Sequence, residues 1–139
     1  MTTVNPEIEK LIKELLDLFD TFAVEHSVGH QPVKLNRYAI EGSGLCFAFE
    51  KNYSSPANIW CPIKVKDFVS GVKKNRESPS SELWKFYNAK GELMYGRHGG
   101  LKKMKELRDA DLIVFSPETS EEGKRVVEAI KKAAAAGIK

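Results

Sequence analysis

The sequence has few cysteines and no long hydrophobic run. Its 139 residues include two cysteines, Cys46 and Cys61, which are too few for a disulfide scaffold and are not spaced as metal ligands. No apolar stretch approaches the roughly 18 residues that cross a bilayer. The first residues have neither the basic nor the apolar part of a secretory signal. These absences predict a cytoplasmic protein in a reducing compartment, without a membrane partner.

The chain also lacks the common motifs for nucleotides and metals. It has no Walker loop, no three-glycine dinucleotide fingerprint and no His-Glu-x-x-His pattern. His26 and His30 lie four residues apart, but Gly29 and Pro32 indicate that the helix has ended there, which makes the pair a poor metal site. We therefore expect no metal and no cofactor.

The composition is that of a folded domain. Hydrophobic residues make up 42% of the chain and charged residues 29%, which argues against a disordered chain. A length of 139 residues favours one domain with one core. We expect residues 1–139 to form a single globular domain.

Apolar periodicity predicts a long helix near each end of the chain. Asn5 is a good N-cap and Pro6 suits the first helical position. Apolar side chains then recur at helical spacing, so a helix is expected over residues 5–26. The last helix is expected after Pro117, with valine, isoleucine and alanine on its inner face.

Between these helices the apolar pattern alternates, as it does in strands. The expected strands are residues 35–40, 45–50, 59–63, 83–87, 92–95 and 112–115. Short helices are expected over residues 65–72 and from Leu101 onward, where the sequence Leu101-Lys102-Lys103-Met104-Lys105 follows the glycines. Because strands and helices do not alternate strictly, the sequence predicts an α+β domain. Its sheet would be mostly antiparallel, with about five to six strands and the long terminal helices packed on it.

The first helix has a second interpretation. Leu15 and Leu18 also fit a heptad pattern that lasts about two and a half heptads. Helix 5–26 would then serve as the seam of a homodimeric protein-interaction subunit. Packing into the chain's own core is the alternative, and both stay open.

Positive charge is concentrated in the middle of the chain. Residues 30–108 hold fifteen basic and seven acidic side chains, a net charge of +8, whereas residues 1–29 carry −4 and residues 109–139 carry −1. Clustered lysine and arginine favour a polyanionic partner. One such group comprises Lys73, Lys74 and Arg76.

A glycine-rich turn at residues 95–100 leads into a lysine-rich helix and is the best candidate site. Gly99 and Gly100 can expose successive N–H groups near the positive end of the helix dipole. Arg97 and His98 can donate hydrogen bonds to a phosphate. The candidate ligand-binding residues here are Arg97, His98, Gly99, Gly100, Lys102 and Lys103. A purely structural turn, with its arginine and histidine in solvent, is the other interpretation.

Aromatic side chains lie among the basic ones. Trp84, Tyr87 and Tyr95 are candidates for stacking on nucleic-acid bases, although aromatics that alternate in a hairpin more often belong to a core. The leading prediction is therefore a non-catalytic module that binds nucleic acid or another phosphate-bearing ligand.

Enzymatic interpretations stay open beside this one. A small phosphoester-acting enzyme would use His98 as general acid or base and Arg97 to stabilise developing charge. In a metal-dependent nuclease, Glu41 and Glu50 would hold a divalent ion, with two lysines following the third strand.

A nucleophilic thiol is a further possibility. It requires the fold to bring Cys46 or Cys61 to a histidine. Buried and inert thiols on strands are the alternative.

Overall fold

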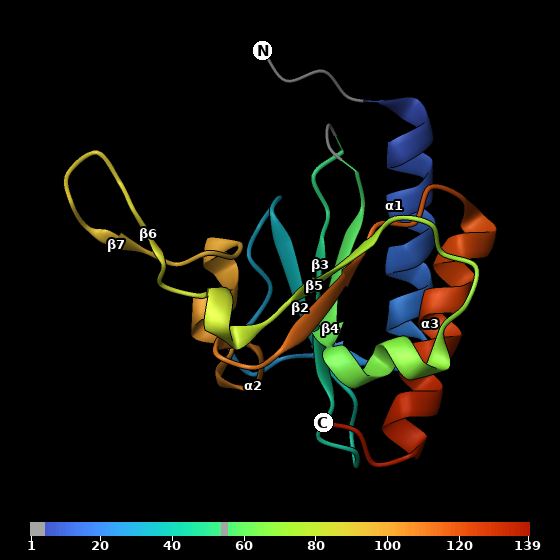
Figure 1. The fold of residues 1–139 in the computed structure, drawn as a ribbon. Helices are drawn as coiled ribbons and strands as arrows, with labels where there is room; N and C mark the ends of the chain where they lie inside the picture. Colours follow the sequence, from blue (N-terminus) through green and yellow to red (C-terminus); the bar gives the residue numbers. More distant parts are fainter. Residues whose placement is uncertain (1–4, 54–55) are drawn as a thin grey trace.

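The fold is an antiparallel sheet with two long helices on one face. The computed structural model describes residues 5–53 and 56–139. Helices α1 (Pro6–Asp20) and α3 (Ser120–Ala135) lie side by side against the sheet (Figure 1). The predicted α+β class is confirmed. In the described residues, no helix has both the length and the apolar character needed to span a bilayer.

The sheet has six strands, all paired antiparallel. In spatial order they are β1 (Val24–Glu25), β2 (Leu35–Ala39), β3 (Cys46–Glu50), β4 (Asn58–Pro62), β8 (Leu112–Phe115) and β5 (Asn75–Ser78). Strand β8, from late in the chain, lies between β4 and β5. It pairs Phe115 with Ile59 on one side and with Asn75 on the other.

Helix α1 begins where the sequence predicts. The side chain of Asn5 accepts hydrogen bonds from the backbone N–H groups of Glu7, at 3.0 Å, and Ile8, at 3.3 Å. The helix ends at Asp20 instead of residue 26. The predicted end is wrong because the chain turns at Thr21 and its next residues pair with β2 as strand β1.

The core between the helices and the sheet is built around Phe19 of α1. Its ring lies 5.3 Å from that of Tyr38, 5.0 Å from that of Phe47 and 5.1 Å from that of Phe49. All four side chains are buried. Edge-to-face and tilted aromatic contacts of this kind add to the free energy gained from burying apolar surface.

The apolar face of α1 is used within the chain. Leu15 is fully buried and packs on α3 at Gly123, where an added Cβ would lie 2.8 Å from Leu15 Cδ2. Leu11 is also buried, and Leu18 packs partly buried against the same core. This packing takes up the side chains on which the homodimer interpretation rested.

The other face of the sheet carries a second, smaller core. Short segments cover it: the 3-10 helices η2 (Ser80–Glu82) and η3 (Gly99–Lys103) and helix α2 (Lys105–Arg108). Leu101, Met104 and Leu107 are fully buried there, against Trp60 and Val114 of the sheet. The short helix predicted to start at Leu101 is thus two short helices that break at Met104.

A two-stranded hairpin stands apart from the sheet, on the side away from α1 and α3 (Figure 1). It consists of β6 (Phe86–Tyr87) and β7 (Leu93–Met94). These strands are shorter than the predicted 83–87 and 92–95 and pair only with each other. The predicted helix over residues 65–72 is instead the 3-10 helix η1 (Ile63–Phe68).

Candidate functional site

Arg97 lies buried inside the protein, with 8% of its surface exposed. Its Nε donates to Ser78 Oγ at 2.8 Å, and Nη2 donates to the carbonyls of Ser78, at 2.5 Å, and Ala110, at 2.6 Å. Its Nη1 donates to the carbonyls of Leu107, at 2.9 Å, and Arg108, at 3.2 Å. A guanidinium has five N–H donors, and these five bonds use them all.

Arg97 is therefore not available to a ligand. Its guanidinium instead holds the end of β5 to the segment that follows α2, because Ser78 belongs to the first and Ala110 to the second. The prediction that Arg97 binds phosphate loses its physical basis. A phosphoester-acting enzyme would equally lack this charge-stabilising group.

His98 is the N-cap of helix η3. Its Nδ1 accepts a hydrogen bond from the N–H of Gly100 at 3.0 Å, and its Nε2 lies 3.9 Å from Glu50 Oε1. The Gly100 N–H is thus bound within the turn and is not offered to an anion. A lone pair on Nδ1 that already accepts a backbone N–H also leaves His98 less suited to proton transfer.

The glycine-rich turn meets a different arginine, Arg37 of strand β2. This side chain is 5% exposed. Its Nε donates to the carbonyl of Gly100 at 3.1 Å, and its Nη1 donates to that of Gly29 at 2.7 Å. Two of its five N–H donors are thereby used, and the other three have no acceptor among the described residues. No carboxylate of the described residues forms an ion pair with it.

Arg37 lines a pocket of about 300 Å³, which we call the Arg37 pocket. Its lining residues are Val28, His30, Gln31, Pro32, Arg37, Gly99, Gly100 and Lys103. Gly100 is required there, because an added Cβ would lie 2.7 Å from Leu35 Cδ2 and 2.8 Å from Gln31 Oε1. The pocket brings together three of the predicted residues: Gly99, Gly100 and Lys103.

His30 adds a neutral donor to this pocket. Its Nδ1 accepts the backbone N–H of Arg37 at 2.9 Å, so the proton of the neutral ring resides on Nε2. Burial lowers the pKa of His30, and Lys51 and Arg37 act in the same direction, against the opposite influence of Glu25 and Asp20. The ring is therefore uncharged at neutral pH.

Sequence reasoning missed Arg37 and considered His30 only as a metal ligand. The signal for Arg37 is its place in the apolar alternation of residues 35–39, where it shares a strand face with Leu35 and Ala39. An arginine between two apolar residues on one face indicates a buried cation.

The basic group of Lys73, Lys74 and Arg76 lies elsewhere. It belongs to β5 and the residues before it, and three strands separate β5 from β2. An acidic residue neutralises it in part, because Lys74 Nζ lies 3.0 Å from Glu118 Oε2. The backbone N–H of Lys73 donates to Glu122 Oε2 at 3.3 Å. The Arg76 guanidinium lies 5.1 Å from the Trp60 ring. The two predicted basic segments do not form one surface.

The predicted aromatic residues form a contact beside η3. The rings of Trp84 and Tyr95 lie 5.3 Å apart, and Lys102 Nζ lies 5.6 Å from the first and 5.7 Å from the second. Tyr95 is buried, and its hydroxyl donates to the carbonyl of Arg108 at 2.7 Å. Tyr95 is consequently a support for Lys102 and Trp84. Tyr87, on the hairpin, is exposed.

The fold does bring a cysteine to a histidine. Ligand-type atoms of His26, Cys46 and Glu106 lie within 4.8 Å of one another. However, His26 Nδ1 accepts the N–H of Val28 at 3.1 Å, and Nε2 contacts Glu106 Oε1 at 2.8 Å. Neither ring nitrogen is left to accept the thiol proton or to bind a metal without losing a hydrogen bond. Burial also raises the pKa of Cys46 to about 11, which disfavours the thiolate.

This is the one cluster of three or more such side chains found in the described residues. The two carboxylates of the nuclease interpretation lie apart, because Glu41 is in the β2–β3 turn and Glu50 pairs with Leu35 at the other end of that hairpin. Glu50 instead accepts a hydrogen bond from Asn58. Cys61 is fully buried, and its burial raises the pKa of the thiol.

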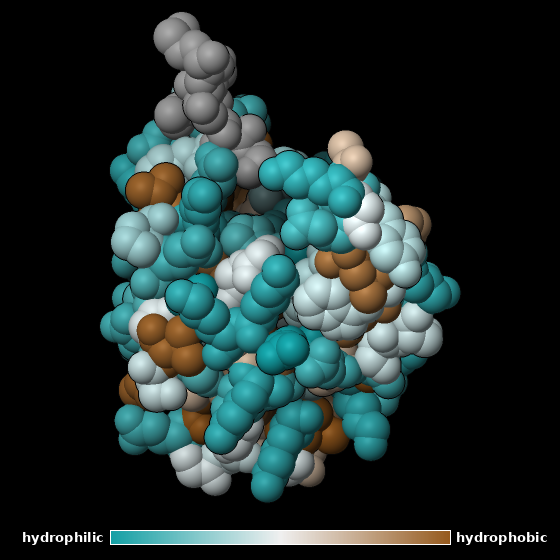
Figure 2. All heavy atoms as spheres, turned by 90° about the vertical axis from the view of Figure 1, so that its left-hand side faces the viewer, coloured by the Kyte–Doolittle hydropathy of each residue, from teal (hydrophilic) through white to brown (hydrophobic). Residues whose placement is uncertain are grey.

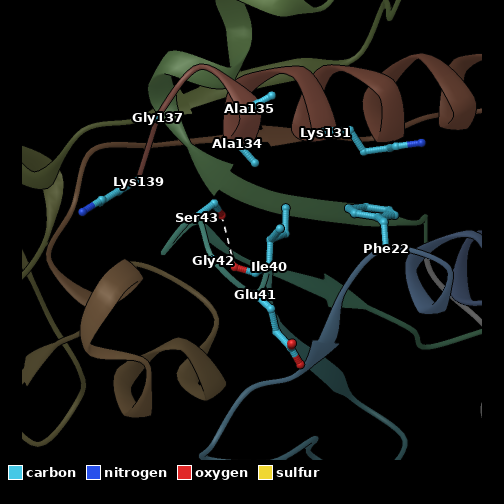
Figure 3. Close-up of a pocket in the computed structure, with 10 residues that line it drawn as sticks. All are labelled: Phe22, Ile40, Glu41, Gly42, Ser43, Lys131, Ala134, Ala135, Gly137 and Lys139. Atoms are coloured by element: carbon cyan, nitrogen blue, oxygen red, sulfur yellow. Dashed lines mark hydrogen bonds between the residues drawn. The ribbon is translucent and has the colours of Figure 1, made fainter.

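A larger and more open hollow lies between the β2–β3 turn and the end of α3 (Figure 3). It measures about 730 Å³, with Phe22 and Lys131 at one end and Lys139 at the other. Lys131 Nζ lies 5.9 Å from the Phe22 ring. Its lining contains no buried charged side chain, so it offers less to a charged ligand than the Arg37 pocket does.

Comparison of the chain with protein-family models, with curated proteins and with solved structures finds no match.

Proposed function

We propose that this chain is a non-catalytic binding module that holds a phosphate-bearing ligand in the Arg37 pocket. One observation carries the proposal: the Arg37 guanidinium is buried, has no carboxylate partner and opens onto a pocket. A buried charge without a counter-ion is costly to a folded protein. A bound anion would offset that cost.

The donors around the pocket suit phosphate. Arg37 has three N–H groups to offer, since two of five are bound to Gly100 and Gly29. Arginine can bind phosphate oxygens with two parallel hydrogen bonds. Lys103 adds a positive charge at the rim, and His30 adds an N–H. A volume of about 300 Å³ is at the lower end of the range for small-molecule sites, which suits a phosphate group and a short part of its carrier.

Binding is favoured over catalysis by the state of the nearby histidines. His30 and His98 each use Nδ1 to accept a backbone N–H, from Arg37 and Gly100 respectively. A general base needs a free lone pair within reach of the ligand. The arrangement supports holding an anion over transferring a proton.

Titration with inorganic phosphate at constant ionic strength tests the proposal. We expect saturable shifts of the Gly99, Gly100 and Arg37 amide signals in ¹H–¹⁵N spectra. Lys103→Gln should weaken the binding about fivefold, the effect of one exposed charged contact. Arg37→Lys should weaken it more than about tenfold, because lysine cannot form the paired hydrogen bonds of a guanidinium.

Lys64→Gln is the matched control for Lys103→Gln. Lys64 is also exposed, lies in η1 and lines a different hollow. It should leave phosphate binding unchanged, and the spectra of all variants report whether they remain folded. Shifts that do not saturate, or that respond equally to Lys64→Gln and Lys103→Gln, would show that phosphate has no specific site here.

A further inference from the structure

The projecting hairpin exposes large apolar side chains on both of its faces. Phe86 is 64% exposed and Tyr87 68%, and Leu93 and Met94 are also exposed. The pairs are Phe86 with Met94 and Tyr87 with Leu93. Because neighbouring residues of a strand point to opposite faces, each face carries one aromatic ring.

The hairpin is held in shape despite its short strands. The side chain of Asn88 accepts hydrogen bonds from the N–H groups of Lys90, at 2.9 Å, and Glu92, at 3.0 Å. Gly91 has a φ of +77°, which its lack of a side chain allows. The buried side chains of Leu83 and Tyr95 anchor the two ends to the second core. The two aromatic rings are therefore presented by a preformed arm.

A basic strip joins this arm to the Arg37 pocket. Lys103 lines the pocket, and its neighbour Lys102 lies over the rings of Trp84 and Tyr95, next to the hairpin ends. None of Lys90, Lys102, Lys103 and Lys105 forms an ion pair with another described residue. By contrast, Lys66 of η1, Lys74 before β5 and Lys85 at the start of the arm are each paired with a glutamate.

The surface around this arm does not have the character of a broad apolar interface. The side of the molecule from which the hairpin projects is mostly hydrophilic, with hydrophobic side chains in several separate places (Figure 2). Exposed rings beside unpaired lysines match a ligand that is both planar and negatively charged.

We propose that the phosphate-bearing ligand is single-stranded nucleic acid. Its bases would stack on Phe86 and Tyr87, and its backbone would follow Lys102 and Lys103 to the Arg37 pocket. This inference rests on the proposed function for the pocket and adds the class of the ligand. A single strand fits better than a duplex, because only unpaired bases offer their faces to aromatic side chains.

Fluorescence anisotropy of a labelled twelve-nucleotide uridine strand tests the inference on the full chain. Phe86→Ser and Tyr87→Ser should each weaken binding about tenfold, a usual effect for one stacked base. Tyr53→Ser is the control, since Tyr53 contacts Lys13 of α1, on the opposite face of the sheet. Lys103→Gln should reduce the slope of log affinity against log salt by about 0.7, the contribution of one phosphate contact to a single strand.

Two further ligands separate stacking from charge. A strand of the same length without bases should bind more weakly by about tenfold or more. A duplex should not compete at equal phosphate concentration. Equal binding of all three ligands, or unchanged affinity in Phe86→Ser and Tyr87→Ser, would overturn the inference. The same holds if the strand does not bind and these variants instead change the sedimentation of the protein, since the arm would then be a protein-binding surface.

The phosphate titration keeps the two proposals apart. Saturable phosphate binding without strand binding overturns only the inference that the ligand is single-stranded nucleic acid. Strand binding that depends on Tyr87 but not on Lys103, with no saturable phosphate binding, overturns the role of the Arg37 pocket alone.

Discussion

Arg97 binds both the side chain and the backbone of Ser78, with Nε donating to the hydroxyl at 2.8 Å and Nη2 to the carbonyl at 2.5 Å. The two residues lie 19 positions apart, and the exposed hairpin lies between them in the chain. The guanidinium therefore ties together the two ends of the segment that carries the arm.

Replacing Arg97 should cost stability and not binding. Arg97→Lys keeps the charge but cannot replace all five hydrogen bonds that Arg97 donates, so some of the acceptors at Ser78, Leu107 and Ala110 lose a donor. We expect a loss of about 3 kcal/mol or more, measured by urea unfolding. Ser78→Ala removes a single hydroxyl acceptor and should cost about 1 kcal/mol.

Arg125→Lys, on the exposed surface of α3, provides the control and should change stability by less than about 0.5 kcal/mol. Folded Arg97→Lys protein should bind phosphate as the wild type does. A variant of unchanged stability that no longer binds phosphate would show that Arg97 belongs to the ligand site.

The contact of Leu15 with Gly123 predicts that Gly123→Ala destabilises the protein, the opposite of the usual effect of this substitution in a helix. Alanine is ordinarily better than glycine in a helix by about 1 kcal/mol. Here Gly123→Ala places a methyl group 2.8 Å from Leu15 Cδ2 in a fully buried position. We expect a destabilisation of about 1–2 kcal/mol.

Leu15→Ala opens space at the same point and should cost about 2–5 kcal/mol alone. In that background Gly123→Ala should become stabilising, and thermal or urea unfolding of the four proteins measures the coupling. Additive effects would mean that the two helices do not touch at this point. Sedimentation of Leu15→Ala tests the homodimer seam separately, because the packing predicts no change in mass.

Glu106 predicts a specific dependence of stability on pH. Burial by itself raises the pKa of Glu106. A hydrogen bond from its own backbone, the hydrogen bond and charge of His26, and a smaller effect of Lys105 all lower the pKa. Together they outweigh burial, so the pKa lies below 4.5. A carboxylate with a lowered folded-state pKa stabilises the protein above its unfolded value, and this contribution is lost as the pH falls through the folded value.

The stability difference between wild type and Glu106→Gln should therefore shrink as the pH falls below 4.5. Urea unfolding across this range measures it. Glu128→Gln, on an exposed pair with Lys131, corrects for the general effect of removing a carboxylate. A difference that grows on acidification would contradict the assigned pKa direction.

Local patterns were enough to predict the main layers of the fold. The apolar stripe of α1, its Asn5 cap and the buried run of β8 depend on neighbouring residues, so the sequence contains their signals. The end of α1 was not predictable in this way. The residues after Thr21 are apolar enough for a helix, but pairing of Val24 with Ala39 decides their conformation.

The candidate site was predicted only in part, because one part of it depends on local sequence and another on tertiary contacts. The turn at Gly99 and Gly100 does line a pocket, as its local sequence indicates. Which arginine faces that pocket depends on contacts between residues far apart: Arg37 reaches Gly100 across 63 positions, and Arg97 turns inward to Ser78. The alternation of residues 35–39 indicates that Arg37 lies on a strand face, but these tertiary contacts decide which arginine reaches the pocket.

The position of β8 also bears on the order in which the sheet is built. During synthesis β5 emerges 34 residues before Leu112 to Phe115, which are its pairing partners. Until β8 is added, β4 has an open edge and β5 has no neighbour in the sheet. Strands whose pairing partner lies later in the sequence fold slowly and leave unpaired edges exposed on the nascent chain. The sheet is thus completed in one late step, when a single central strand joins two earlier parts.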